Sequence, residues 1–203
     1  MTRVAIIYYS LYGHVAKMAK QLKKGVEAGG ATCDIYQVAE TLSEEILGKM
    51  GAPPKDPEVP IMTPDKMAEY DGFLFGISGR YGSLPGQMKT FMDSTGQLWM
   101  KGALVGKAAG VFQSTGSQGG GQETIGLTTI PFFAHHGMVF VPLGYIDPKA
   151  MSHDEIHGSS AYGSGTFAGA DGSRQPSQLE LDIAESHGKH FAAITSKLAK
   201  AEV

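Results

Sequence analysis

The sequence predicts an α/β domain built on a doubly wound parallel sheet with helices on both faces. Near-continuous apolar, β-branched runs recur along the chain and are typical of strands buried on both faces. Stretches with helical periodicity alternate with these runs, which favours parallel strands joined by crossover helices. The 203 residues are enough for one such domain and few for two, so we expect a single domain over residues 1–203.

The first strand and the first helix are the clearest elements. Arg3 to Tyr9 reads as a buried strand. A helix is predicted next, because apolar residues recur on one face while lysines occupy the other: Val15, Met18, Ala19, Leu22 and Val26. The pair Gly29-Gly30 is a suitable C-terminal stop for this helix.

The remaining elements continue the alternation and complete a predicted five-stranded sheet. Four further strands are expected, at Thr32–Gln37, Gly72–Ile77, Lys107–Gln113 and Met138–Leu143. The most evident later helices are Gln87–Leu98 and Leu179–Ala199. We expect the strand order 2-1-3-4-5.

Two segments do not fit this alternation. The proline-rich segment Gly51–Pro64 is expected to run over the surface. Gly144–Ser177 is long and rich in glycine and serine, and a loop of that length inside a domain is usually functional or disordered. Because it contains aromatic residues and several turn signals, we interpret it as an ordered excursion from the domain.

Composition excludes several classes of function. Seventeen Lys and Arg against 20 acidic residues give a net charge of −3, which leaves no basic excess for nucleic-acid binding. The single cysteine, Cys33, excludes an intrachain disulfide framework and indicates a reducing compartment. No apolar run reaches the ~18 residues that span a bilayer. We therefore expect a cytoplasmic protein without a membrane span.

Three loops predict where the chemistry lies. In the expected strand order, the segments after strands one, three and four meet at the carboxyl edge of the sheet: Ser10–His14, Ser78–Ser83 and Ser114–Gln122. The first can hold a phosphate on the backbone N–H groups of a helix N-terminus, although an ordinary capped turn is equally compatible. Tyr81 can stack on a flat ring or simply fill the core. Gly119–Gly121 allows close approach of a flat ligand or forms a mobile loop.

Other chemical motifs are absent or incomplete. The chain has no GxGxxG dinucleotide fingerprint, no Walker A loop and no GxSxG nucleophile elbow. His153 and His157 are spaced as in a zinc protease, but the residue after His153 is Asp rather than Glu and the segment is not a firm helix. We expect no metal site. His135 and His136 are adjacent, so at most one of them faces a given ligand on a helix.

Several motifs along the whole chain resemble the WrbA family of flavodoxin-like, FMN-dependent NAD(P)H:quinone oxidoreductases, which includes fungal benzoquinone reductases. The matching stretches are YYSLYGH at 8–14, GRYG at 79–82, GQLWMKGAL at 96–104, STG at 114–116, AHHGM at 134–138, VPLGY at 141–145 and AGADGSRQPSQLE at 168–180. The resemblance implies a flavodoxin-like fold and FMN as the cofactor.

The resemblance also implies roles for individual residues. The FMN ligands would be Ser10, Leu11, Tyr12, Gly13, His14 and Val15 at the phosphate, Gly79, Arg80 and Tyr81 at the ring, and Ser114, Thr115, Gly116, Ser117, Gln118 and Gly119 at the ring and ribityl chain. Tyr12 would contact the nicotinamide and Trp99 the substrate. His136 would approach the flavin from a helix end, steadying charge on the flavin or quinone oxygen as the catalytic residue. Gly79 stands where relatives carry a hydroxyl residue.

The implied activity is two-electron transfer from NAD(P)H to quinones, which yields hydroquinones. One cavity serving both substrates predicts ping-pong kinetics. The alternatives are a flavodoxin-type electron carrier or a flavin-binding regulatory or scaffold protein. A carrier would surround FMN with carboxylates, whereas Glu123 is the sole acid in and directly after the three loops, which favours the enzyme.

The resemblance implies a homotetramer, with a dimer as the smaller form at low concentration or without FMN. The segment Leu98–Met100 gives this some physical support, because a large apolar cluster at a helix end normally marks an interface or a ligand pocket. We expect Trp99 to cover a flavin site near a subunit boundary.

Overall fold

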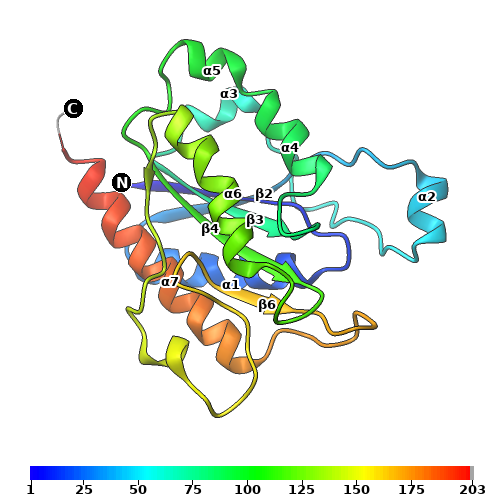
Figure 1. Ribbon diagram of the computed structural model, residues 1–203. Coiled ribbons are helices and arrows are strands. Elements are labelled where there is room, and N and C mark those ends of the chain that lie inside the picture. The colour runs from blue at the N-terminus through cyan, green and yellow to red at the C-terminus, as the bar shows by residue number, and fades with distance from the viewer. Residues whose placement is uncertain (202–203) are drawn as a thin grey trace.

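The computed structural model describes residues 1–201 and contains a six-stranded, wholly parallel sheet (Figure 1). Its main path has the predicted order, β2-β1-β3-β4-β5, with β6 beside β4. The strands are β1 (Arg3–Tyr8), β2 (Thr32–Gln37), β3 (Gly72–Ser78), β4 (Ala108–Thr115), β5 (Val139–Phe140) and β6 (Gly165–Phe167). Central strands are buried on both faces, and Ile6 of β1 lies in register between Ile35 and Leu74.

The fifth position of the sheet differs from the prediction, because two short strands share it. β5 pairs with the start of β4, at Ala108 and Ala109, whereas β6 pairs with the end of β4. The predicted strand Met138–Leu143 is therefore too long. The last bond to β4 runs from the Val141 N–H to the Ala109 oxygen, at 2.8 Å; Gly144, with φ 59°, then turns the chain into the excursion and donates to the Ala161 oxygen instead. The excursion returns as β6.

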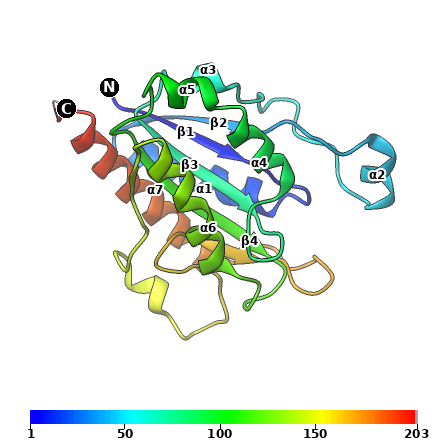
Figure 2. The same ribbon diagram turned by 45° about the horizontal axis from the view of Figure 1, so that its top comes forward.

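The helices cover both faces of the sheet (Figures 1 and 2). They are α1 (His14–Ala28), α2 (Glu44–Lys49), α3 (Pro64–Met67), α4 (Gly86–Asp93), α5 (Gly96–Met100), α6 (Gln122–His135) and α7 (Gln178–Leu198), with a 3-10 turn at Pro148–Met151. α1 and α7 pack on one face, and α3, α4 and α6 pack on the other. A Cβ on Gly188 of α7 would lie 2.2 Å from the Leu22 oxygen of α1, so these two helices are in close contact.

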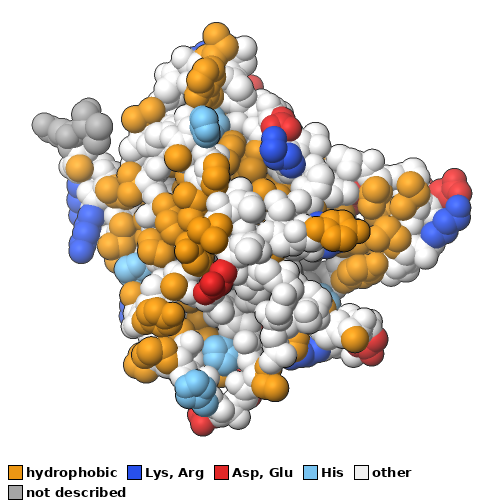
Figure 3. All heavy atoms as spheres, viewed as in Figure 1, with side chains coloured by type: hydrophobic (Ala, Val, Ile, Leu, Met, Phe, Trp, Pro, Cys, Tyr) orange, Lys and Arg blue, Asp and Glu red, His pale blue; other side chains and the backbone are white. Residues whose placement is uncertain are grey.

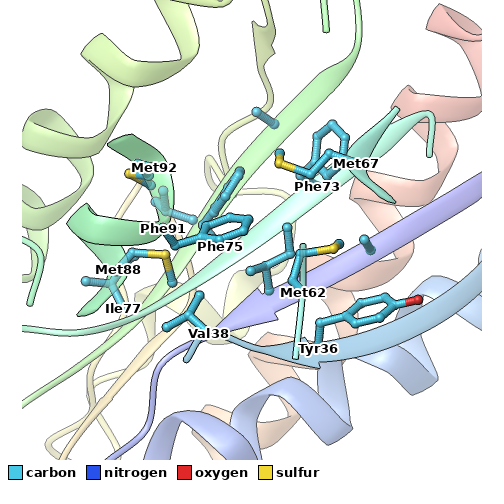
Figure 4. Close-up of a cluster of buried hydrophobic side chains, with 14 of the residues drawn as sticks. Tyr36, Val38, Met62, Met67, Phe73, Phe75, Ile77, Met88, Phe91 and Met92 are labelled. Atoms are coloured by element: carbon cyan, nitrogen blue, oxygen red, sulfur yellow. The ribbon is translucent and has the colours of Figure 1, made fainter. Parts of the chain in front are cut away.

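The predicted helix Gln87–Leu98 is in fact two helices, α4 and α5. The hydroxyl groups of Ser94 and Thr95 donate to the carbonyl oxygens of Phe91 and Met92, and such local bonds compete with continued helix. The methionines of α4 are packing residues: Met88 and Met92 are buried against Phe75 and Ile77 in the cluster that Figure 4 shows. Among residues 1–201, none of the helices combines the length and apolar character needed to cross a bilayer.

Candidate active site

The three loops singled out in the sequence do lie together at the carboxyl edge of the sheet. They enclose a pocket of about 360 Å³ that opens between the ends of β1, β3 and β4. Its lining residues are Ser10, Tyr12, His14, Val15, Met50, Ser78, Gly79, Arg80, Ser114, Thr115, Gly116, Ala168, Gly169 and Gly172. A pocket at this edge is where open parallel sheets bind their ligands.

The first loop leaves the N-terminus of α1 open. Its N-cap residue, Gly13, has φ 91°, a conformation that favours glycine, and nothing lies within 4 Å of where a Cβ would be. Among residues 1–201 no side chain caps α1, and the first turn of α1 contains no acid. The Ser10 hydroxyl accepts from the Gly13 N–H at 3.1 Å, which closes the loop. The N–H groups of the first turn are therefore available to an anion from outside the chain.

His14 begins α1 and lies against the pocket. Its side chain is buried, and its Nε2 lies 2.8 Å from the backbone oxygen of Arg174. Because a carbonyl oxygen only accepts, Nε2 carries the proton. The Nδ1 atom has no hydrogen-bond partner among residues 1–201, so it is the ring nitrogen that can face a ligand.

The second loop is a tight turn in which Arg80 and Ser83 exchange backbone hydrogen bonds. Tyr81 and Gly82 have φ of 52° and 74°, as a type I′ turn requires. Tyr81 is fully exposed and does not line the pocket of this chain, so it is not core packing. Arg80 does line it, and its Nη1 donates to Ser78 Oγ at 3.1 Å and to the Gly79 oxygen at 2.9 Å.

Gly79 has a packing reason that the sequence did not reveal. A Cβ at this position would lie 2.5 Å from the Cδ1 atom of Ile125 on α6 and 3.3 Å from the Ser114 oxygen. A hydroxyl residue would require the end of the Ile125 side chain to move. The glycine therefore allows α6 to pack close to the end of β3.

The third loop divides between two hollows. Ser114, Thr115 and Gly116 line the main pocket, as predicted. Gln118 and Gly119 instead line a separate hollow with Gln122 and His157, and Ser117 lines neither. The chain turns away because Thr115 Oγ1 donates to the Ser117 oxygen at 2.7 Å, and the loop then enters α6.

Sequence reasoning missed one wall of the pocket, formed by the turn Ala168–Arg174. The Ala168 N–H donates to the Thr115 oxygen at 2.8 Å, which fastens the turn to the end of β4. Gly169 and Gly172 both have positive φ and line the pocket. The signal was present, since Asp171-Gly172 was identified as a turn, but nothing in the sequence placed it beside β4.

A second missed wall comes from the segment after α2. The backbone oxygen of Met50 accepts from the Tyr12 hydroxyl at 3.2 Å, and Met50 lines the pocket. Glu40 anchors this segment to the body by accepting from the Tyr9 hydroxyl at 3.1 Å and from Gln87 Nε2 at 3.0 Å. Leu11 points away from the pocket into the core.

Two predicted residues, Trp99 and His136, lie far from the pocket of their own chain. α6 begins beside the carboxyl edge and runs 14 residues, about 21 Å at 1.5 Å per residue, before His136. Trp99 is exposed on α5, which precedes β4 and lies on the side away from the pocket (Figure 1). Both residues therefore occupy the amino edge of the sheet.

His136 is held at this edge by Thr95, whose Oγ1 lies 2.9 Å from His136 Nε2. Burial, followed by the neighbouring His135, lowers the pKa of His136, so the ring is neutral near pH 7. The Thr95 hydroxyl also donates to the Met92 oxygen, which favours a proton on His136 Nε2. Among the described residues the buried Nδ1 has no partner.

The pocket fits the FMN that the motifs imply. The open N-terminus of α1 suits a phosphate, and small residues at Ser114–Gly116 and Gly79 leave room for a flat ring. No residue lining it is Asp or Glu, within the 201 residues that the structure describes, whereas Arg80 and His14 supply positive or hydrogen-donating groups.

Metal chemistry finds no support in this part of the chain. Within residues 1–201 there is no cluster of three His, Cys, Asp or Glu side chains that could hold an ion. Both ring nitrogens of His157 are taken by backbone oxygens, of Gly158 and Ser152.

Comparisons with known proteins place these features in a family context. A family model described as NADPH-dependent FMN reductase matches residues 2–150. The chain is 54% identical over 197 residues to the NAD(P)H quinone oxidoreductase PST3 of Candida albicans, covering 96% of this chain and 98% of that protein. It is 53% identical over 199 residues to the quinone-oxidoreductase QR2 of Triphysaria versicolor, covering 97% of each.

Among solved structures, the fold is similar to that of a flavodoxin, WrbA-like protein from Agrobacterium tumefaciens. The TM-score is 0.65 at 22% identity, over 97% of this chain and 99% of the other. This likeness confirms the flavodoxin-like fold, and the sequence relatives confirm the resemblance that the motifs indicated.

Proposed function

This chain belongs to the family of NADPH-dependent FMN reductases, and from that membership we propose that it reduces quinones with NAD(P)H through FMN bound at the carboxyl edge of the sheet. The observation that carries the proposal is the pocket beside α1, with its uncapped helix N-terminus and its lining free of carboxylates. Bound FMN supplies the two-electron chemistry, taking a hydride from NAD(P)H and passing two electrons to the quinone.

The residues of the pocket bind and orient rather than react. The first-turn N–H groups of α1 and the His14 ring hold the phosphate. Arg80, fixed by Ser78 and Gly79, places a cation beside the ring, where it stabilises negative charge on the reduced flavin. Tyr12 forms an aromatic wall against which nicotinamide or a flat quinone can pack.

The charge pattern favours an enzyme over an electron carrier. A one-electron carrier would place carboxylates at the flavin to keep its potential low, and the pocket lining contains none within residues 1–201. The test is the visible spectrum of the purified protein incubated with FMN. We expect flavin bands that survive desalting and bleach when NAD(P)H is added. A protein that retains no flavin would contradict the proposal.

We propose a ping-pong order because one pocket has to serve both substrates in turn. Tyr12, Met50 and Arg80 all line this one pocket, so nicotinamide has to leave before a quinone enters. Initial rates at several quinone concentrations should give parallel double-reciprocal lines. Intersecting lines would mean separate nicotinamide and quinone sites.

We also propose that the chain is a homotetramer and that Trp99 and His136 act on the pocket of another copy. Both residues lie at the edge opposite the pocket of their own chain, so a second copy is needed to bring them to a flavin. Exposed hydrophobic residues lie on α5, in the turn after it, on α6 and at the start of β5, on a face where Figure 3 shows orange side chains: Trp99, Met100, Val105, Leu127 and Val139. There the neutral His136 ring would have to turn its Nε2–H from Thr95 to the quinone oxygen in order to steady charge on it.

Sedimentation with and without FMN tests the assembly. We expect a tetramer that FMN strengthens, because a ligand bound near the interface prefers the assembled state. A mass near 21.5 kDa at micromolar concentration under both conditions would refute it. Co-refolding Ser10→Glu with His136→Ala chains then tests the sharing of sites. Activity above that of either variant alone is expected if His136 acts in another copy's pocket.

A further inference from the structure

A buried ion pair lies directly behind the wall of the pocket. Arg174 Nη1 donates to Glu180 Oε2 at 3.0 Å and to the Phe167 oxygen at 2.9 Å, and its guanidinium lies 3.8 Å over the Phe167 ring. Glu180 is fully buried. Its carboxylate also accepts from the Thr166 hydroxyl at 2.7 Å and from the Gly158 N–H at 2.8 Å.

The backbone of Arg174 is bonded to two residues that line the pocket, Ala168 and His14, although Arg174 itself does not line it. The Arg174 N–H donates to the Ala168 oxygen at 2.8 Å, which closes the turn that carries Gly169 and Gly172. The Arg174 oxygen accepts from His14 Nε2, also at 2.8 Å. One residue therefore joins the buried carboxylate to the imidazole at the start of α1.

We propose that Arg174 is a positioning residue for the phosphate end of the FMN site and that it acts through His14. Its side chain fixes the turn, the turn fixes its carbonyl oxygen, and that oxygen keeps the proton on His14 Nε2 and the ring in one orientation. Nδ1 then faces the ligand, and it donates to the phosphate when the ring carries a proton on that nitrogen as well. This inference rests on the proposed binding of FMN in the pocket.

Any residue at position 174 would supply a backbone carbonyl oxygen for His14. The role of Arg174 therefore depends on its guanidinium, which holds the turn in place. Nη1 alone meets Thr166, Phe167 and Glu180, while Nη2 donates to the Ile156 oxygen at 3.3 Å. Lysine keeps the charge but has a single nitrogen, so it cannot hold both positions, and it does not stack flat on a ring. Arg174→Lys should therefore fold yet hold the turn loosely. Arg174→Ala removes the anchor altogether and leaves the Glu180 charge without its partner.

Riboflavin, which lacks the phosphate, separates positioning from general support of the fold. We would titrate each protein with FMN and with riboflavin and follow flavin fluorescence. For Arg174→Lys and Arg174→Ala we expect FMN to bind about tenfold more weakly, or worse, since one hydrogen bond to a charged group is lost. Riboflavin affinity should change by less than about twofold, because the ring and its walls are retained.

Arg3 provides a matched control variant. It is also an arginine over an aromatic ring, 4.6 Å from the centroid of Tyr70, and it pairs with Asp34 and Glu69 at the amino end of β1. Arg3→Ala should leave both affinities unchanged. Combining Arg174→Lys with His14→Ala should weaken FMN no further than His14→Ala does, because the two residues act in series.

Each outcome decides something. Equal losses for FMN and riboflavin, or no loss for either, would overturn the positioning role. An additive double variant would show that Arg174 acts without His14 and would also overturn it. If the unaltered protein binds neither flavin, the proposed function fails instead. Because the Arg174→Ala variant can unfold, the Arg174→Lys variant provides a second test. In flavin-free Arg174→Lys, the ¹⁵N chemical shifts of the His14 ring should show that the proton is no longer fixed on Nε2.

Discussion

The N-termini of α1 and α7 lie beside the same edge of the sheet, on helices that pack closely together. They differ in how their free N–H groups are capped. α7 carries a full capping box: Ser177 Oγ accepts from the Glu180 N–H at 3.2 Å, and Glu180 accepts from the Ser177 N–H at 2.9 Å. α1 has a glycine N-cap, no side-chain cap and no acid in its first turn.

The two helices accept different anions at their N-termini. The positive end of α7 is neutralised by a carboxylate of its own chain, so this terminus is complete on folding. The positive end of α1 remains open towards the pocket, so it is complete only with an anion from outside. The N-terminus of α7 therefore contributes to folding stability, and the N-terminus of α1 contributes to ligand affinity. Arg174 and His14 connect the two termini, because Arg174 bonds to Glu180 of α7 and to His14 of α1.

The largest effect is expected from removing the internal anion with Glu180→Ala. Arg174, Thr166 and the N–H groups of Gly158 and Ser177 would lose their acceptor in a buried place. Breaking a buried pair in this way costs about 3–5 kcal/mol. Urea unfolding of the flavin-free protein measures it, with Glu185→Ala, an exposed acid of the same helix, as the control. A loss below about 1 kcal/mol would mean that the cap of α7 is not a centre of stability.

The second-largest effect should follow from giving α1 an internal anion with Ser10→Glu. The carboxylate would occupy the open terminus and repel phosphate, so FMN should bind at least about a hundredfold more weakly. The free energy of unfolding should change little, because Ser10 is only half-buried. Ser10→Gln matches the size without the charge and should bind FMN more tightly than Ser10→Glu. FMN binding by Ser10→Glu as tight as the parent's would remove α1 as the phosphate site.

Much of this contrast was readable in the sequence. The run Arg3–Tyr9 followed by Gly13 allowed either an open helix terminus or an ordinary capped turn, and the capping-box spacing of Ser177 and Glu180 was present but not used. Strand periodicity is local, which is why Thr32–Gln37 was predicted with its observed bounds.

The parts that the sequence did not reveal depend on contacts between distant segments. Gly79 is small because of Ile125, and the turn Ala168–Arg174 forms a wall because it pairs with Thr115. The location of Trp99 and His136 had a local signal that was not used. α6 was not identified, because its outer face is apolar and Pro131 interrupts the pattern, and the length of α6 alone separates His136 from the pocket.

An intermediate loss of folding stability is expected when the pH is lowered, and the group responsible lies on α7 rather than α1. Burial, followed by the nearby His190, lowers the pKa of His187 on α7 to about 3. The unfolded chain, with a pKa near 6.5, therefore takes up the proton first, and folded stability falls as the pH drops from about 6.5 towards 3. The flavin-free protein should lose about 2 kcal/mol between pH 7 and pH 5. His187→Leu should show a flatter dependence, whatever its stability at pH 7. An unchanged slope would assign the acid sensitivity to other groups.

The smallest effect is expected from Ser177→Ala, which removes the hydroxyl half of the capping box. Loss of an N-cap costs about 1 kcal/mol, so urea unfolding of the flavin-free protein should detect it. Ser43→Ala is the control, because Ser43 caps the short and exposed α2 at a longer distance, 3.4 Å, and should cost less. FMN affinity should stay within about twofold of the parent's, since Glu180 remains fixed by Arg174, Thr166 and Gly158 and so keeps the turn that orients His14. If Ser177→Ala weakened FMN as strongly as Arg174→Lys, any loosening of α7 would disturb the pocket, and the closed and open termini would have to be regarded as one unit.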